Sequence, residues 1–109
     1  MLENRIQNEA DKLISFIKRF WDDKVSNIKI TDIADKPFDI FTLAMKLYKK
    51  FDIMMEYERS TLAISVKIDD EFVYLDELTD EPIFIGFESY YPENLLFNFK
   101  LLDKVLKSM

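Results

Sequence analysis

The sequence predicts an α+β fold: two N-terminal helices, a three- to four-stranded antiparallel meander and one C-terminal helix, forming a single domain over residues 1–109. Apolar residues recur at helical spacing near both ends, and they alternate at strand spacing over residues 53–57 and 61–68. Strands grouped between helices favour α+β over an alternating parallel sheet. The chain length suits one domain, and no repeat or linker-like composition interrupts it.

The first helix is predicted over residues 2–21. Trp21 continues its apolar stripe, so we expect this side chain in the core, and the polar residues Asp22, Asp23 and Lys24 end the helix. Residues 28–34 alternate only briefly and predict either a short strand or an extended link. The stripe itself steps by four and three residues: Ile6, Ala10, Leu13, Ile17 and Phe20.

A second helix is predicted over residues 36–50. Asp35 suits its N-cap and Pro37 its first turn, where a missing N–H has no cost. Lys49 and Lys50 fall in the last turn, where the helix dipole favours cations. Its apolar face would comprise Ile40, Phe41, Ala44, Leu47, Tyr48 and Phe51.

The strongest strand signal is the alternation over residues 61–68, preceded by a similar alternation over residues 53–57. Arg59 and Ser60 separate the two runs, so we expect a hairpin. Shorter strands follow at residues 72–75 and 82–88. Pro92 then opens a C-terminal helix with the apolar stripe Leu95, Phe99, Leu102, Leu106 and Met109.

Composition excludes the commonest enzyme classes. Histidine and cysteine are absent, which removes the usual general base, thiolate chemistry and the His or Cys ligands of metals. The single glycine, Gly86, excludes glycine-rich phosphate loops. A calcium loop starting at Asp69 would place Tyr74 where an EF-hand needs glycine. Nothing singles out the carboxyl pair that glycosidase-type catalysis requires. We expect no enzyme activity, no cofactor and no metal.

No apolar run approaches the roughly 18 residues of a membrane span. Residues 1–20 carry seven charges, so they predict no signal peptide. The absence of cysteine agrees with a reducing compartment. We therefore expect a cytoplasmic protein with no membrane partner.

The net charge of −6 is concentrated in one segment. Residues 68–99 contain no lysine or arginine, whereas the rest of the chain has more basic than acidic residues. Ordinary soluble surfaces mix the two signs. Nine acidic residues fall in this segment: Asp69, Asp70, Glu71, Asp76, Glu77, Asp80, Glu81, Glu88 and Glu93.

Seven of these acids occupy two turns that flank the predicted strand at residues 72–75. Solvated turns are often acidic, so the simplest alternative is a surface without a binding role. Unmixed like charge, however, costs stability and is suited to steering a basic protein partner, whereas nucleic acid would require the opposite sign. Tyr90 and Tyr91 follow Glu88 and are candidate interface anchors. The predicted partner-binding residues are Asp69, Asp70, Glu71, Asp76, Glu77, Asp80, Glu81, Glu88, Tyr90 and Tyr91.

In size, acidity and charge distribution the chain resembles bacterial toxin-immunity proteins, such as those paired with nuclease toxins of contact-dependent growth inhibition systems or with colicins. These proteins are small, acidic, cytoplasmic and non-enzymatic, and they neutralise a basic toxin domain by covering its active site or a neighbouring surface. The resemblance covers the whole chain but rests on no diagnostic motif, so it assigns no role to a single residue. It implies a cognate toxin domain as the partner.

Two other functions are compatible with the sequence. One is a non-enzymatic adaptor or accessory subunit, including a homo-oligomer, that uses an exposed sheet face or helix stripe. The other is an unusual enzyme or small-ligand binder, which would need a concave pocket lined by tyrosines and carboxylates.

Overall fold

The computed structural model describes residues 5–34, 40–58, 61–82 and 92–109, and it shows an α+β fold. An N-terminal helix precedes a five-stranded antiparallel sheet, and a second long helix ends the chain. The elements are α1 (Arg5–Trp21), the 3₁₀ turn η2 (Asp22–Lys24), β1 (Val25–Ala34), β2 (Ile40–Leu47), β3 (Phe51–Glu58), β4 (Thr61–Ile68), β5 (Glu71–Tyr74), the short helix α2 (Leu75–Leu78) and α3 (Pro92–Lys107).

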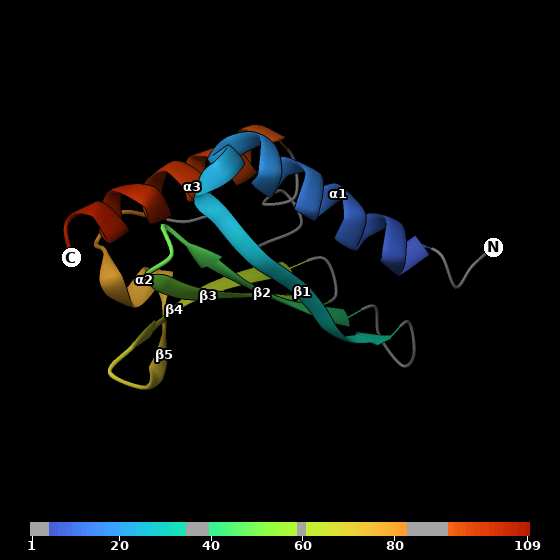
Figure 1. The fold of residues 1–109 in the computed structure, drawn as a ribbon, viewed down its shortest axis with the longest axis horizontal. Coiled ribbons are helices and arrows are strands. Elements are labelled where there is room, and N and C mark those ends of the chain that lie inside the picture. Colours follow the sequence, from blue (N-terminus) through green and yellow to red (C-terminus); the bar gives the residue numbers. More distant parts are fainter. Residues whose placement is uncertain (1–4, 35–39, 59–60, 83–91) are drawn as a thin grey trace.

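The sheet is a simple meander in which each strand pairs with the next, in the order β1-β2-β3-β4-β5. Figure 1 shows that α1 and α3 lie together on one face of this sheet. The opposite face carries neither long helix. Antiparallel sheets commonly bury one face and leave the other open, and here the alternating buried residues of β2, β3 and β4 point toward the helices.

The apolar stripes predicted for the two terminal helices form the core. Leu13 and Ile17 of α1 and Phe99 of α3 are fully buried. Trp21 is buried as expected, and its ring centroid lies 4.7 Å from that of Phe99. At the two stripe ends the prediction was less accurate, because Phe20 is only partly buried and Met109 is half exposed beyond the end of α3.

The second predicted helix is wrong: the described part of that region, residues 40–50, forms β2 and the turn after it. Phe41, Leu43, Met45 and Leu47 are buried and alternate with partly exposed residues, which is the period of a strand. The segment is apolar enough to satisfy the helical period as well. Pairing with β1 and β3 on both sides decides between the two, since strand preference depends mainly on cross-strand packing. The predicted N-cap Asp35 lies outside the described residues.

Residues 28–34, for which the sequence predicts either a short strand or an extended link, are part of β1, an edge strand of ten residues. Its register with β2 shifts twice, between Ser26 and Lys29 and between Thr31 and Ala34. Asn27 has a φ of 56° and lies in the first shift, and Asp32 with a φ of 55° lies in the second. Each shift adds one residue to β1, as in a β-bulge, and bulges interrupt the regular edge that another strand would need for pairing.

The predicted β3–β4 hairpin is confirmed, with Glu58 opposite Thr61. The strand expected at residues 72–75 is β5, which ends one residue earlier because Leu75 turns into α2 and is buried. The strand expected at residues 82–88 lies outside the described residues, apart from Pro82, which is irregular. The sheet exceeds the predicted three or four strands because β1 and β2 join it.

Asp69 and Asp70 form the two-residue turn between β4 and β5, with Ile68 opposite Glu71. Both aspartates have positive φ, 52° and 69°, which is the backbone of a type I′ hairpin turn. Aspartate tolerates this conformation better than most residues, so the turn itself supplies a structural reason for two of the acids.

Replacing Asp70 with glycine is expected to raise the free energy of unfolding by about 0.5 kcal/mol, because glycine has no Cβ to strain at positive φ. Thermal unfolding followed by circular dichroism measures this. Asp76→Gly is the matched control, since Asp76 lies in α2 and glycine there should lower stability. A destabilised Asp70→Gly protein would contradict the assigned turn.

Candidate functional site

The predicted acids lie around β5, on the side of the sheet away from β1. One cluster is the turn before β5 and its first residue, and the other lies on α2 and in the segment after it. All seven side chains are exposed. The first cluster comprises Asp69, Asp70 and Glu71, and the second comprises Asp76, Glu77, Asp80 and Glu81.

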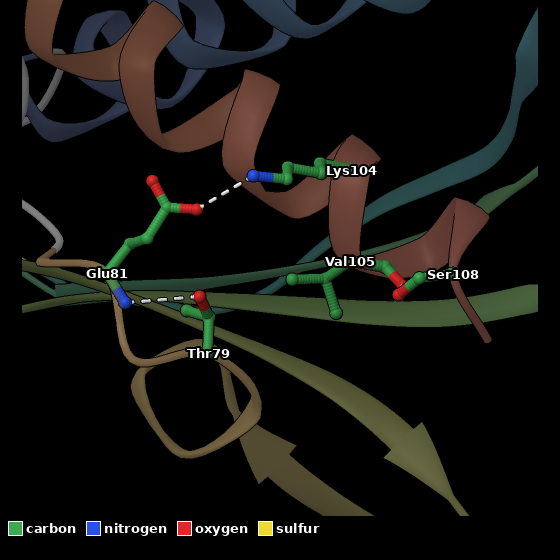
Figure 2. A network of polar contacts seen from close by, with 5 residues as sticks. All are labelled: Thr79, Glu81, Lys104, Val105 and Ser108. Carbon is green, nitrogen blue, oxygen red and sulfur yellow. Dashed lines mark hydrogen bonds and ion pairs between the residues drawn. The ribbon is translucent and has the colours of Figure 1, made fainter.

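Two acids of the second cluster are used within the fold. The backbone N–H of Tyr74 donates to Glu77 Oε2 at 3.3 Å, so this carboxylate lies against the end of β5. Lys104 Nζ of α3 lies 3.0 Å from Glu81 Oε2, and the Glu81 N–H donates to Thr79 Oγ1 at 3.2 Å (Figure 2). Residues 68–99 contain no lysine or arginine, but the fold places Lys104 of α3 beside one of their acids.

The carboxylates of the other five acids make no hydrogen bond or ion pair with any described residue: Asp69, Asp70, Glu71, Asp76 and Asp80. Their charges are within about two Debye lengths of one another, because β5 is only four residues long and a strand rises about 3.3 Å per residue. The β5 side of the protein therefore has a predominantly negative surface, which also includes one exposed cation, Lys67 of β4, opposite Phe72.

Sequence reasoning missed the two aromatic residues between these clusters. Phe72 and Tyr74 are 43% and 47% exposed, among the most exposed large hydrophobic residues described. They alternate with Val73, so both rings lie on the open face of the sheet, opposite the helices. The period of two along β5 could have identified them, but only if the buried face had been known.

Three of the predicted site residues cannot be placed. Glu88, Tyr90 and Tyr91 lie outside the described residues. The candidate site in the described structure is therefore the β5 surface, which we define as Phe72 and Tyr74 together with the two acidic clusters.

Two surface hollows are lined by described residues. One lies between α3 and Glu81 and is lined also by Phe97 and Lys100. Another lies beside the β2–β3 turn and includes Asp23 and Lys24. Each contains a single described carboxylate, whereas glycosidase-type catalysis needs two. Within the described ranges no three Asp or Glu side chains are grouped to hold a metal ion, and none of the helices there is long and apolar enough to cross a membrane.

A polar cluster on the helix side joins three distant parts of the chain through Asp103 of α3. Asp103 Oδ1 accepts a hydrogen bond from Trp21 Nε1 at 3.1 Å and another from the Tyr48 hydroxyl. Lys107 Nζ lies 2.9 Å from Asp103 Oδ2. Tyr48 has a φ of 57°, which is unusual for a bulky residue, and its N–H also donates to the Lys24 carbonyl at 2.8 Å. These bonds hold the β2–β3 turn against α1 and α3.

The same contacts shift three pKa values. Partial burial acts to raise the pKa of Asp103, but hydrogen bonds from Tyr48, Lys107 and Trp21 and the charge of Lys107 outweigh it, so this pKa is lowered. Burial, the hydrogen bond to Asp103 and its negative charge raise the pKa of Tyr48. The hydrogen bond to Asp103 and the same charge raise the pKa of Lys107. Each shift favours the protonation states present at neutral pH.

These shifts predict a stability that is lost at both pH extremes. A lowered Asp103 pKa stabilises the fold above the ordinary aspartate value of about 3.9 and is lost as pH falls through the folded-state pKa. The raised Tyr48 and Lys107 pKa values stabilise below about pH 10 and are lost as pH rises through their folded-state values. Urea unfolding between pH 2 and 11 should show that Asp103→Asn flattens the acid limb relative to the parent protein. An unchanged acid limb in Asp103→Asn would contradict the assignment.

Comparison with known proteins found no match to this chain among family models, curated proteins or solved structures. The candidate site therefore rests on the geometry of the described residues.

Proposed function

We propose that this chain is an acidic binding protein that neutralises a basic protein partner through the β5 surface, and that the partner is a toxin domain, as for the immunity proteins it resembles. The observation that carries this proposal is the arrangement on β5: two exposed aromatic rings between two acidic clusters, in which Glu81 alone has a described ion-pair partner.

Each part of this surface has a physical role in binding a basic protein. Aromatic side chains are typical anchors at the centres of interfaces, because they combine large apolar area with few rotatable bonds. Acids around them accelerate encounter with a cationic partner and disfavour neutral or acidic ones. Binding to the active-site cleft of a nuclease would place the carboxylates where substrate phosphates lie.

Self-assembly, the main alternative, has less support at the sheet edges. The β1 edge contains two irregularities at Asn27 and Asp32, and the β5 edge is short, acidic and closed at Tyr74 by Glu77. Bulges, short edge strands and charge are the features that oppose strand pairing between copies. The second candidate function is an adaptor that binds its partner through side chains.

The direct test is affinity capture of the tagged chain from its native host, followed by mass spectrometry and by expression of the recovered partner. A stoichiometric basic protein would support the proposal if its expression alone in the bacterial cytoplasm is lethal and its co-expression with this chain is harmless. A recovered partner that is acidic or harmless would contradict it. Recovery of the bait alone, as a dimer, would favour the self-assembling alternative.

A further inference from the structure

The β5 surface continues from the edge strand onto the open face of the sheet. Ala44, Met54, Ser65 and Tyr74 are consecutive cross-strand neighbours, so they form one row across β2, β3, β4 and β5. The first three are half-buried or buried although no long helix covers this face. Short side chains on β2 and β4 therefore make a low floor beside the taller Tyr74 ring.

The row itself carries no charged side chain, whereas the row on one side contains Glu56 and the row on the other contains Lys67. Ser65 is only 2% exposed, since it lies between Met54 on β3 and Tyr74 on β5. The Tyr74 hydroxyl lies 3.5 Å from Glu56 Oε1, at the long limit of a hydrogen bond, which shows that the ring leans across β4 toward β3. Phe72 lies one row away, opposite Lys67. This uncharged row thus crosses the sheet and reaches β5 at Tyr74, between the two acidic clusters.

The backbone of β5 offers little to an added strand. Because its turn has two residues, Ile68 and Glu71 are a hydrogen-bonded pair, and the pairs then alternate. The N–H and C=O groups of Phe72 and Tyr74 consequently point away from β4, toward the outer edge of the described sheet. The Tyr74 N–H is already taken by Glu77. Only Phe72 presents both of its edge groups, which is too few for the backbone hydrogen bonding that strand addition uses.

Taken with the proposed function, on which this step rests, we propose that the basic partner docks a helix, and not a strand, onto the β5 surface. The helix would run along β5 with an apolar side against Phe72, Tyr74 and the adjacent Ser65, and its cationic residues would reach the acidic clusters at both ends of β5. Helices bind apolar grooves through such a face, with anchors spaced by whole turns.

The dimensions fix the spacing of the cations. The four residues of β5 span about 13 Å at about 3.3 Å per residue. A helix rises about 1.5 Å per residue, so basic residues about 7–11 positions apart on one helical face would reach both clusters. A partner helix that binds both acidic clusters is therefore expected to have basic residues at this spacing.

The probe is an alanine-based helical peptide of about 18 residues with arginines about 11 positions apart and leucines between them on the same face. A second peptide replaces one central residue by proline, which breaks the helix but keeps the charges. Fluorescence anisotropy at low salt should show at least about tenfold tighter binding of the unbroken peptide, an energy difference of about 1.4 kcal/mol.

Variants of the protein locate the binding face. Phe72→Ala with Tyr74→Ala should weaken binding of the helical peptide by at least about tenfold without any change in charge. Ile33→Ala is the matched control, because Ile33 is a comparably exposed apolar residue on β1 and should have no effect. Circular dichroism confirms that each variant is folded, and Tyr74→Phe, which keeps the ring, should retain most of the affinity.

Three outcomes would overturn helix docking. Equal binding of both peptides would mean that charge alone attracts them. Tighter binding of the broken peptide, with new hydrogen-exchange protection of the Phe72 amide, would indicate strand addition. Binding of neither peptide, or loss of binding in Ile33→Ala, would contradict the assignment of binding to the β5 surface. None of these decides the proposed function, which depends on capture and co-expression of the natural partner.

Discussion

Replacing Asp103 with alanine is expected to lower the free energy of unfolding by about 2–3 kcal/mol, because Trp21 and Tyr48 lose a charged acceptor and are left as partly buried donors. For a chain of this length that corresponds to a fall in Tm of roughly 10 °C. Urea unfolding at pH 7 and thermal unfolding measure the two quantities. The effect is large because one carboxylate connects α1, α3 and the β2–β3 turn.

Two variants make the Asp103 prediction specific. Asp11→Ala removes an exposed acid whose only described hydrogen bond comes from the nearby Gln7, and it should change stability by less than about 0.5 kcal/mol. Tyr48→Phe combined with Asp103→Ala should cost less than the sum of the two single changes, because they remove the same hydrogen bond. Strict additivity, or an Asp103→Ala protein as stable as its parent, would contradict a stabilising network.

The parts of the fold that could be predicted from the sequence are those whose periodicity is unambiguous. Leu13 and Ile17 in α1 and Leu102 in α3 repeat at helical spacing over four turns, and all are buried. The residues of β2 satisfy both periods at once, since Phe41 and Leu47 belong to either pattern. Pairing with β1 and β3 selects the strand, and a local pattern does not contain that information.

The candidate site shows the same division between local and long-range information. Acids such as Asp76 and Asp80 could be predicted as exposed because they lie in turns and on a short helix with many charges. The ion pair between Glu81 and Lys104 joins residues 23 positions apart, so no local pattern of residues predicts it. Asp103 reaches Trp21 over 82 positions. Contacts of this kind depend on how α3 packs against α1 and the sheet.

The exposure of Phe72 and Tyr74 was not predicted from the sequence. An alternating strand has one buried face, and apolar residues usually indicate which. In β5 the larger rings lie on the open side, while Val73 and the following Leu75 face the core. A strand that exposes its largest apolar residues contradicts the usual pattern, and such local conflicts are expected mainly at functional surfaces.

Reversing the charge of Asp76 and Asp80 together to lysine is expected to weaken binding of the captured partner by at least about 100-fold, since like charges placed opposite one another cost several kcal/mol. These two acids are chosen because they have no described ion-pair partner, whereas Glu77 and Glu81 support the fold. At low salt, where electrostatic steering is strongest, most of the loss of affinity should come from a slower association rate.

The matched control reverses Asp11 and Asp23, which are equally exposed but lie on α1 and η2. Both double variants change the net charge by the same amount, so a general effect of charge would weaken binding equally in the two. Surface plasmon resonance at two salt concentrations separates these cases: a loss confined to Asp76 and Asp80 assigns binding to the β5 surface. Equal losses would instead mean that the partner responds to net charge, and undiminished binding in both would place its contact elsewhere on the molecule.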